Sequence, residues 1–436
     1  MFFRKVHLFL LSFLLLTAVL AAQAQFSLVR RMIDSISAER VTGHIDHLQI
    51  AGGHRSRANF TPGLDSAVAY VQRMFNTMPG ISSVCLDTFF VPSARPPFNI
   101  KPMFNVVASI RGSNASSGTI VIGAHIDACG NRSPGWDQQW DTMHVPGADD
   151  NASGIAAVLE LACVMSDTAI GFIPINPIDF VAFGVEETGP AYTGYLYGSG
   201  RYALRATTNG KNIVGMASLD MIGFNDLNNM YLNIAADERS QWLGNHIVAM
   251  NDSFQLGITL NAPPFAYGRW SDHAPFWDQG FPAVCLIECA PPWTGNPYYN
   301  GNPYYHTTAD TLGTLNRGLL KKSTQLAMAT FATLASAATP VEKERRTFPA
   351  KLFLEQNYPN PFNPNTTIRF WIRNAGYTTL EVYDMLGTKV TSLADGQKSS
   401  GMHQTIFDGS QLSSGIYLYR LTNNGTTVSR KMLLLK

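Results

Sequence analysis

The stretch GTIVIGAHIDA, from Gly118 to Ala128, decides the fold of the larger part of this chain. Its first half is a short run of apolar, mostly β-branched residues, which is typical of a strand buried on both faces of a sheet. Its second half places His125 and Asp127 directly after that strand. In an open α/β sheet, ligands bind at the carboxyl ends of the strands. The stretch therefore predicts a buried sheet with a polar site at its edge.

Similar apolar runs recur on either side of this strand and alternate with helical patterns. Strands are predicted over the ranges 118–123, 178–183, 213–219 and 281–287. Helices are predicted over the ranges 153–165, 195–206, 238–251 and 315–338. Strands that are apolar throughout need helices on both faces of their sheet. We therefore expect an α/β fold, a three-layer α/β/α sandwich with a mostly parallel mixed sheet.

Acids and histidines follow the predicted strands or lie in the loops beside them. These side chains are His125, Asp149, Asp150, Glu186, Glu187, Asp220 and His306. Each one alone is also typical of a buried histidine, a solvated loop or the first turn of a helix. Together at one edge of a sheet they favour a site for zinc or a related divalent ion, which imidazole and carboxylate suit. Two cations there could activate a water and polarise a carbonyl, and Glu186 would remain as the general base.

At these residues the sequence resembles the secreted di-zinc aminopeptidases, which are related to carboxypeptidases and glutaminyl cyclases. The matching fragments, in the family's order, are GAHIDA from Gly123, GADDNASGIAA from Gly147, FGVEETG from Phe183, LDM from Leu219 and HTTADTL from His306. The resemblance covers roughly residues 25–338. It implies that His125, Asp150 and Asp220 bind one zinc ion, and that Asp150, Glu187 and His306 bind the other. Asp150 would bridge the two. It is chosen over Asp149 because it lies four residues before Gly154, as in the family pattern.

The resemblance also implies supporting roles for residues beside the ligands. A cis peptide is expected after Asp150, and Asp127 is expected to hold the ligating imidazole of His125. Asp272 belongs to a Ser-Asp-His segment that supports the metal site without binding the metal, although a packed structural loop is an alternative interpretation.

A tyrosine holds the oxyanion in some members of the family. Tyr305, beside His306, and Tyr267 are the two candidates in this sequence, and we favour Tyr305.

The predicted function is that of a secreted metallo-aminopeptidase acting on peptides or proteins. The motif GNPYY occurs from Gly295 and again from Gly301, with Trp293 upstream. These aromatic residues predict either a rigid surface loop or a wall beside the metals that favours large apolar N-terminal residues. A glutaminyl cyclase-like acyltransferase, a carboxypeptidase and an inactive surface binding protein are the alternatives. A carboxypeptidase would need a cationic clamp, for which the candidates are Arg201, Arg205 and Arg269.

Residues 1–24 have the features of a secretory signal peptide: Arg4 and Lys5, an apolar run, and Ala22-Gln23-Ala24 as the cleavage site. No later segment reaches the roughly 18 apolar residues of a membrane span. Export permits disulfides, and a Cys285–Cys289 bridge and isolated buried thiols are both open. The net charge of +1 gives no reason to expect a nucleic-acid partner.

The C-terminal part of the chain is predicted as a separate body. A charged, proline-closed linker at 341–349 separates a zinc peptidase domain at 25–340 from residues 350–436. Short β-rich runs at 366–372, 378–383, 389–392, 404–407 and 416–421 predict a small all-β sandwich.

This second body resembles the sorting domain of bacterial type IX secretion. The matching fragments are NYPNPFNPNTTIRF from Asn357, LEVYDMLGTKV from Leu380 and LSSGIYLYRL from Leu412. The resemblance implies the type IX machinery as a partner and passage through the periplasm to the cell surface or the medium. An adhesive β-domain is the alternative.

Overall fold

The computed structural model of the chain describes residues 20, 22–54, 56–114, 117–224, 230–261, 268–288, 301–336, 352–354, 356–357, 360–372, 375–398 and 401–435. The chain divides into two compact units, Met1–Thr339 and Pro340–Lys436. Most of the predicted signal peptide and the whole predicted linker lie outside the described residues.

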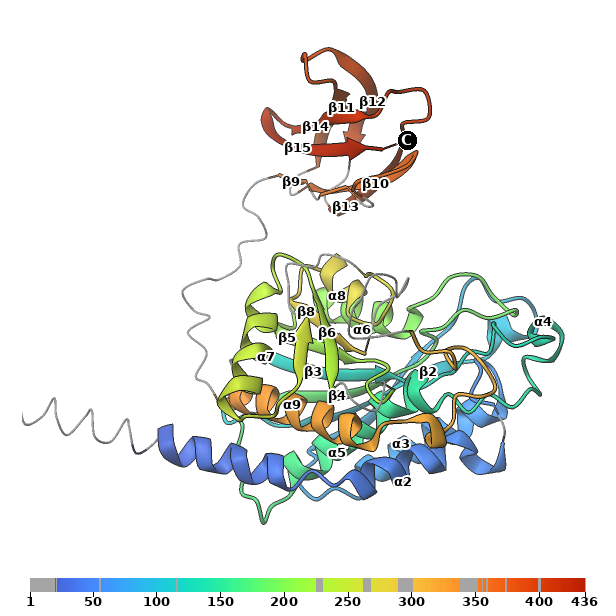
Figure 1. Cartoon of the computed structure of the whole chain (residues 1–436), viewed down its shortest axis with the longest axis vertical. Coiled ribbons are helices and arrows are strands. Elements are labelled where there is room, and N and C mark those ends of the chain that lie inside the picture. The colour runs from blue at the N-terminus through green and yellow to red at the C-terminus, as the bar shows by residue number, and fades with distance from the viewer. Residues whose placement is uncertain are drawn as a thin grey trace, which may run out of the picture. The chain divides into compact units, whose positions relative to one another are not determined.

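A mixed sheet of eight strands forms the centre of the first unit (Figure 1). The strands are β1 (Ser83–Phe89), β2 (Met103–Ile110), β3 (Thr119–His125), β4 (Ile178–Phe183), β5 (Ile213–Leu219), β6 (Tyr231–Ala236), β7 (Thr259–Asn261) and β8 (Ala283–Ile287). Their order across the sheet is β1-β2-β4-β3-β5-β8-β6-β7. The central strands β4, β3, β5 and β8 are parallel, whereas β1, β2 and β6 join by antiparallel pairing.

Helices cover both faces of this sheet. They are α2 (Ala38–Gln49), α3 (Pro62–Asn76), α4 (Trp136–Gln139), α5 (Gly154–Ser166), α6 (Tyr197–Thr208), α7 (Gln241–Ser253), α8 (Ala274–Asp278) and α9 (Arg317–Ser336). Ile120 and Ile122 of β3 belong to the same core cluster as buried residues of α5 and α9. Val121, between them, packs in a different cluster with Tyr202 of α6 and Phe276 of α8. The predicted three-layer sandwich is confirmed.

Each strand and helix predicted for the first unit is present. The predicted strands 178–183 and 213–219 coincide with β4 and β5, and the predicted helix 195–206 corresponds to α6. The sequence patterns do not predict strands β1, β2, β6 and β7 or helices α2, α3, α4 and α8. Strand β1 lies at the sheet edge and exposes several side chains, so it has no continuous apolar run. Helix α2 buries only one stripe, including Val41, Ile45 and Leu48.

The second unit consists of two antiparallel sheets. Its strands are β9 (Phe353–Leu354), β10 (Asn365–Ile372), β11 (Gly376–Tyr383), β12 (Lys389–Lys398), β13 (Gly401–Asp408), β14 (Gly415–Asn423) and β15 (Thr426–Leu434). The sheets have the orders β13-β10-β9 and β12-β11-β14-β15. Ile368 and Phe407 from the first sheet share one core with Leu380 and Tyr419 from the second. This is the predicted β-sandwich, with β9 and β15 in addition.

Two smaller expectations concern the cysteines and membrane insertion. Cys85, Cys129, Cys163 and Cys285 carry free thiols, and Cys289 lies outside the described residues.

Among the helices that the structure describes, none has the length and apolar character needed to cross a membrane.

Candidate active site

Strand β3 ends at His125, whose imidazole faces two of the predicted acids. Its Nε2 lies 3.1 Å from Asp150 Oδ1 and 3.4 Å from Asp220 Oδ1. Its Nδ1 lies 3.2 Å from the backbone oxygen of Asp127, on the opposite side of the ring. His125 and both acids are buried. The three residues assigned to one metal ion are therefore brought together by the ends of β3 and β5 and by the turn that precedes α5.

Asp150 lies between the two histidines. Its Oδ1 faces His125, and its Oδ2 lies 3.0 Å from His306 Nε2. The same His306 nitrogen lies 2.8 Å from Glu187 Oε1. The two carboxylate oxygens of Asp150 thus face different histidines, an arrangement that would let this side chain bridge two cations. The expected cis peptide is present between Asp150 and Asn151.

The loops that carry these side chains adopt uncommon backbone conformations. Val185, Met221 and His306 have positive φ angles of 57°, 49° and 59° although none is glycine. Gly147 also has a positive φ, of 53°, and a Cβ there would lie 2.5 Å from the backbone oxygen of Asp150. Such conformations are disfavoured for residues with a side chain and gather at functional sites. Val185 and Met221 follow strands β4 and β5, and Gly147 and His306 lie in loops that carry the other acids and the second histidine.

The Asp127 carboxylate lies beside His125 and accepts hydrogen bonds from other segments. Its Oδ1 is 3.7 Å from His125 Nδ1. Its Oδ1 accepts a hydrogen bond from the backbone N–H of Glu186 at 3.1 Å, and its Oδ2 accepts one from that of Glu187 at 3.0 Å. Asn59 donates a third hydrogen bond to Oδ2 at 2.6 Å. Through these contacts Asp127 joins the end of β3 to the loop after β4.

Two further residues that the sequence analysis did not identify hold the turn that carries Asp150. Asp310 accepts hydrogen bonds from the backbone N–H groups of Asp149 and Asp150, at 2.9 and 3.0 Å. The buried guanidinium of Arg57 donates to the backbone oxygens of Ile126 and Gly147, at 3.0 and 2.8 Å, and to those of Leu48 and Pro146. Asp310 could have been suspected from its place in the HTTADTL fragment. Nothing local in the sequence marks Arg57.

The electrostatics of this cluster suit cations. Burial raises the pKa of Glu186 well above its ordinary value, and it raises the pKa of Glu187 to about 7. Burial also acts to raise the pKa of Asp150, but hydrogen bonds from the two imidazoles outweigh it and lower that pKa. Asp220 Oδ1 accepts no hydrogen bond from the described residues. Buried acids this close repel one another unless cations or protons lie between them.

Three groups of described side chains have donor atoms within 4.8 Å of one another, close enough to hold a metal ion. One is His125, Asp150 and Asp220, the predicted first set. Another is His125, Glu186 and Glu187. The third combines Glu187 and His306 with Cys129, a residue that the sequence analysis did not associate with the site. The donor types and their burial fit the predicted metal centre.

A pocket of about 250 Å³ opens onto these side chains. Its apolar wall is made of Tyr195, Met221, Trp270, Ile287 and Tyr305, and its polar wall includes His125, Asp150, Glu186, Glu187, Asp220 and His306. The Tyr305 ring stacks on the His306 imidazole, with 3.7 Å between ring centroids. The guanidinium of Arg132 lies 4.7 Å from the centre of the same tyrosine ring. Tyr267, the alternative oxyanion tyrosine, lies outside the described residues.

The remaining predicted residues fall in different places. Asp272 is buried in the segment before α8, and burial raises its pKa to about 7 while the charge of His125 opposes that shift. The first GNPYY motif and Trp293 lie outside the described residues. In the second motif, Asn302 donates hydrogen bonds to Asp149 and Glu288, at 3.2 and 3.1 Å.

The three candidate arginines for a carboxylate clamp are paired elsewhere. Arg205 lies 2.7 Å and Arg201 3.9 Å from Asp87 Oδ1, and Arg269 is paired with Asp278. None of them is among the described residues that line the pocket.

Comparison with known families and proteins identifies both units. Residues 105–331 match the family described as peptidase family M28, and residues 356–435 match the secretion system C-terminal sorting domain. A probable leucine aminopeptidase of Arthroderma otae is 31% identical over 216 residues, which cover 49% of this chain and 52% of that protein. A probable zinc metalloprotease of Leptosphaeria maculans is 30% identical over 297 residues, covering 60% and 65%. The chain thus spans less than two thirds of either relative.

Solved structures share the fold at lower sequence identity. The LapA aminopeptidase of Legionella pneumophila has a TM-score of 0.56 at 22% identity, covering 71% of this chain and 75% of that one. A glutaminyl cyclase of Porphyromonas gingivalis has a TM-score of 0.55 at 20% identity, covering 69% and 99%. Since both chemistries occur on this fold, the fold alone does not choose between them.

Proposed function

This chain belongs to peptidase family M28, and on that premise we propose that it is a two-zinc aminopeptidase that removes apolar residues from the N-terminus of peptides. The observation that carries the proposal is Asp150, whose two carboxylate oxygens each face a different histidine of the buried cluster. His125, Asp150 and Asp220 would hold one zinc ion, and Asp150, Glu187 and His306 the other. When bound, the two ions activate the attacking water and polarise the scissile carbonyl.

Glu186 is the general base in this proposal. It lines the pocket beside the proposed ligand Glu187, and the hydrogen bond from its backbone N–H to Asp127 fixes its place on the loop. Its carboxylate takes the proton of the attacking water and returns it to the leaving amine. Positioned proton transfer of this kind contributes about 10²–10⁴-fold to the rate.

Tyr305 is proposed to stabilise the oxyanion. Its ring contacts both the His306 imidazole and the Arg132 guanidinium, and these contacts restrict where its hydroxyl group can lie. A donor fixed in this way needs little reorganisation when negative charge develops on the carbonyl oxygen.

The pocket supports an exopeptidase that recognises an amino rather than a carboxyl terminus. The carboxylate of Glu186, the one described lining acid not assigned to a zinc ion, attracts the ammonium group of a free N-terminus, and Met221 and Trp270 offer apolar surface to the first side chain. A C-terminal carboxylate would find no lysine or arginine among the described lining residues. This arrangement favours aminopeptidase over carboxypeptidase activity.

The second unit supports an extracellular place of action. Its match to a secretion sorting domain indicates a secreted or cell-surface protein. We propose the type IX route, in which this domain directs passage out of the periplasm and takes no part in catalysis.

The decisive experiment compares peptides that differ only at their N-terminus. A leucyl peptide with a free amino group should lose its first residue, and its N-acetylated form should remain intact, as followed by mass spectrometry. Glycyl and glutamyl peptides should be cleaved more slowly than the leucyl peptide. A peptide with N-terminal glutamine tests the glutaminyl cyclase alternative, because cyclisation releases ammonia and leaves the chain length unchanged. Cleavage of the acetylated peptide from its C-terminus would support a carboxypeptidase instead.

A further inference from the structure

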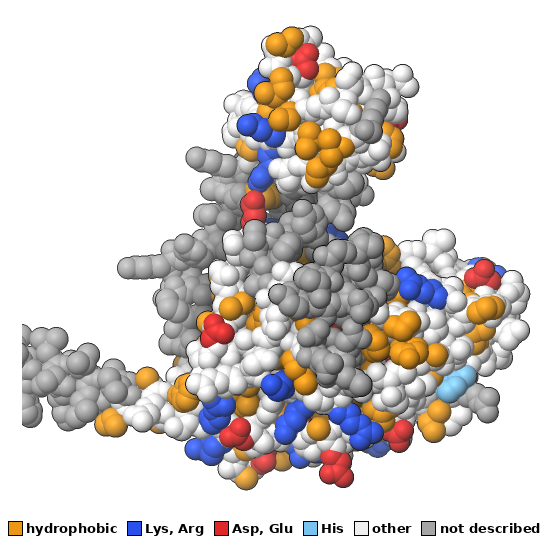
Figure 2. All heavy atoms as spheres, viewed as in Figure 1, with side chains coloured by type: hydrophobic (Ala, Val, Ile, Leu, Met, Phe, Trp, Pro, Cys, Tyr) orange, Lys and Arg blue, Asp and Glu red, His pale blue; other side chains and the backbone are white. Residues whose placement is uncertain are grey.

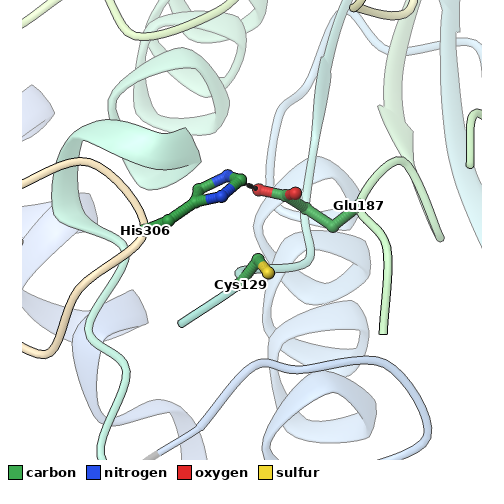
Figure 3. Close-up of side chains that lie close together, drawn as sticks. All are labelled: Cys129, Glu187 and His306. Carbon is green, nitrogen blue, oxygen red and sulfur yellow. Dashed lines mark hydrogen bonds and ion pairs between the residues drawn. The ribbon is translucent and has the colours of Figure 1, made fainter. Parts of the chain in front are cut away.

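Cys129 lies within the candidate metal centre although no assigned role uses it. Its Sγ, a carboxylate oxygen of Glu187 and a ring nitrogen of His306 all lie within 4.8 Å of one another. Figure 3 shows the three side chains converging from separate segments of the chain. Cys129 follows β3, whereas Glu187 follows β4 and His306 lies in the loop before α9.

The thiol is buried, and its hydrogen bonds leave room for a metal bond. Cys129 has 3% of its surface exposed, and its S–H donates to the backbone oxygen of Thr188 at 3.6 Å. The sulfur also accepts a hydrogen bond from the backbone N–H of Asn131. Because sulfur has two lone pairs, one remains for a metal ion. Donor atoms around a tetrahedral zinc ion lie roughly 3.5 Å apart, given zinc bonds of about 2.0–2.3 Å. Small side-chain movements are therefore enough for one ion to contact all three donors.

A sulfur donor changes which ions such a site prefers. Carboxylate and imidazole alone accept a wide range of divalent ions, including manganese. Thiolate sulfur is soft and selects zinc and other thiophilic ions over magnesium, calcium and manganese. The first predicted set, with His125, Asp150 and Asp220, contains no sulfur. The two halves of the centre would thus differ in selectivity.

We propose that Cys129 is a ligand of the metal ion held by Glu187 and His306, and that it makes this half of the centre selective for thiophilic ions. The inference rests on the proposed function, because Glu187 and His306 are two of the zinc ligands assigned there. On binding, a metal–sulfur bond forms and the S–H bond breaks. The proton passes to solvent, and the backbone oxygen of Thr188 loses its donor.

X-ray absorption at the zinc edge tests this assignment on the full chain. The protein is stripped with a chelator and reloaded with two equivalents of zinc. We expect sulfur scattering at about 2.3 Å in the original protein. It should disappear in the near-isosteric Cys129→Ser variant and remain in Cys163→Ser, which replaces a half-buried thiol of helix α5 outside the metal groups.

Cadmium retention gives a second measurement that does not depend on turnover. Competition with a chelator should show that Cys129→Ser holds one of two cadmium ions about 10- to 100-fold more weakly, the range typical of altered partners at a metal site. Manganese retention should change little. The sulfur signal is measured on the unmutated protein, so the spectroscopic test remains valid even if the serine variant folds poorly.

The outcomes separate this inference from the proposed function. Two bound zinc ions with only nitrogen and oxygen neighbours would overturn the role of Cys129 and leave the proposed peptidase intact. Sulfur scattering that persists in Cys129→Ser would also overturn it, because the sulfur would come from another cysteine. A protein that binds no zinc would contradict the proposed function and the inference together.

Discussion

The two units of this chain differ in the polar side chains that they bury. The first unit buries a cluster of charged side chains, including Asp127, Asp150, Glu186 and Glu187. None of the second unit's described acids is buried, and its buried polar residues are neutral and paired, as in the 2.9 Å hydrogen bond from Asn423 to Thr378. Burying charge opposes folding unless partners or cations offset its cost. The concentrated buried charge therefore supports the first unit as the place of the proposed chemistry.

Exposed apolar side chains do not separate the two units in the same way. Figure 2 shows hydrophobic side chains on both units, and Met385, Leu386 and Ile406 of the second are exposed, as are Ile100 and Ile173 of the first. The comparison predicts that changes in the buried acids of the first unit alter turnover, whereas loss of the second unit alters delivery.

The largest expected effect follows from replacing Glu186 by Gln. The variant should keep its zinc and lose about 10²–10⁴-fold in kcat, because the amide cannot accept the proton. Steady-state kinetics with metal analysis measure both quantities. The matched control is Glu160→Gln, a buried acid of helix α5 that pairs with Arg40 at 2.7 Å and should change stability but not turnover. A Glu186→Gln variant that retained most of its activity would contradict the assigned role.

A change at Asp220 should alter the metal content. Asp220 is assigned to only one metal ion, whereas Asp150 is shared, so Asp220→Ala should reduce bound zinc from two equivalents to one. Metal analysis after dialysis gives the answer. Two equivalents in the variant, or a single equivalent in both proteins, would refute the two-zinc arrangement.

A smaller effect is expected at Asp310, which contacts the backbone of Asp149 and Asp150 rather than a proposed metal ion. In Asp310→Asn one oxygen becomes an amide nitrogen that cannot accept a hydrogen bond from those N–H groups. Zinc affinity should fall by about 10- to 100-fold, as for other supporting residues of metal sites. Chelator competition measures the change, and unaltered affinity would mean that the turn keeps its shape without Asp310.

The smallest effect is expected from removing the second unit. Each unit has its own core cluster, and every proposed ligand lies in the first. A fragment of residues 25–341 should thus be as active per mole as the full chain. In a host with type IX secretion, deletion of residues 351–436 should leave the enzyme in the periplasm. An inactive fragment would contradict the claim that the first unit alone performs catalysis. Normal surface delivery without the second unit would contradict its role in secretion.

The sequence by itself determined the four central strands β4, β3, β5 and β8 and most of the candidate ligands. Strands β4 and β5 are buried along their whole length and mostly apolar because helices cover both faces of the sheet, so local composition identifies them without knowledge of the fold. Glu187 and Asp220 directly follow these strands or lie in the next loop, and parallel strands bring such positions to one edge. Edge strand β1 and the amphipathic helix α2 were not predicted from the sequence because only part of each is apolar.

Only the tertiary structure decided how the ligands are held. Arg57 and Asn59 reach their partners across 69 and 68 residues of chain, and Asp310 reaches the turn at Asp149 across 161. Cys129 approaches Glu187 and His306 only because three loops meet at the sheet edge. A local sequence pattern indicates which face of a helix or strand is buried and which reactive side chains come directly after it. Contacts between distant segments depend on how the elements pack, and no single stretch of sequence encodes them.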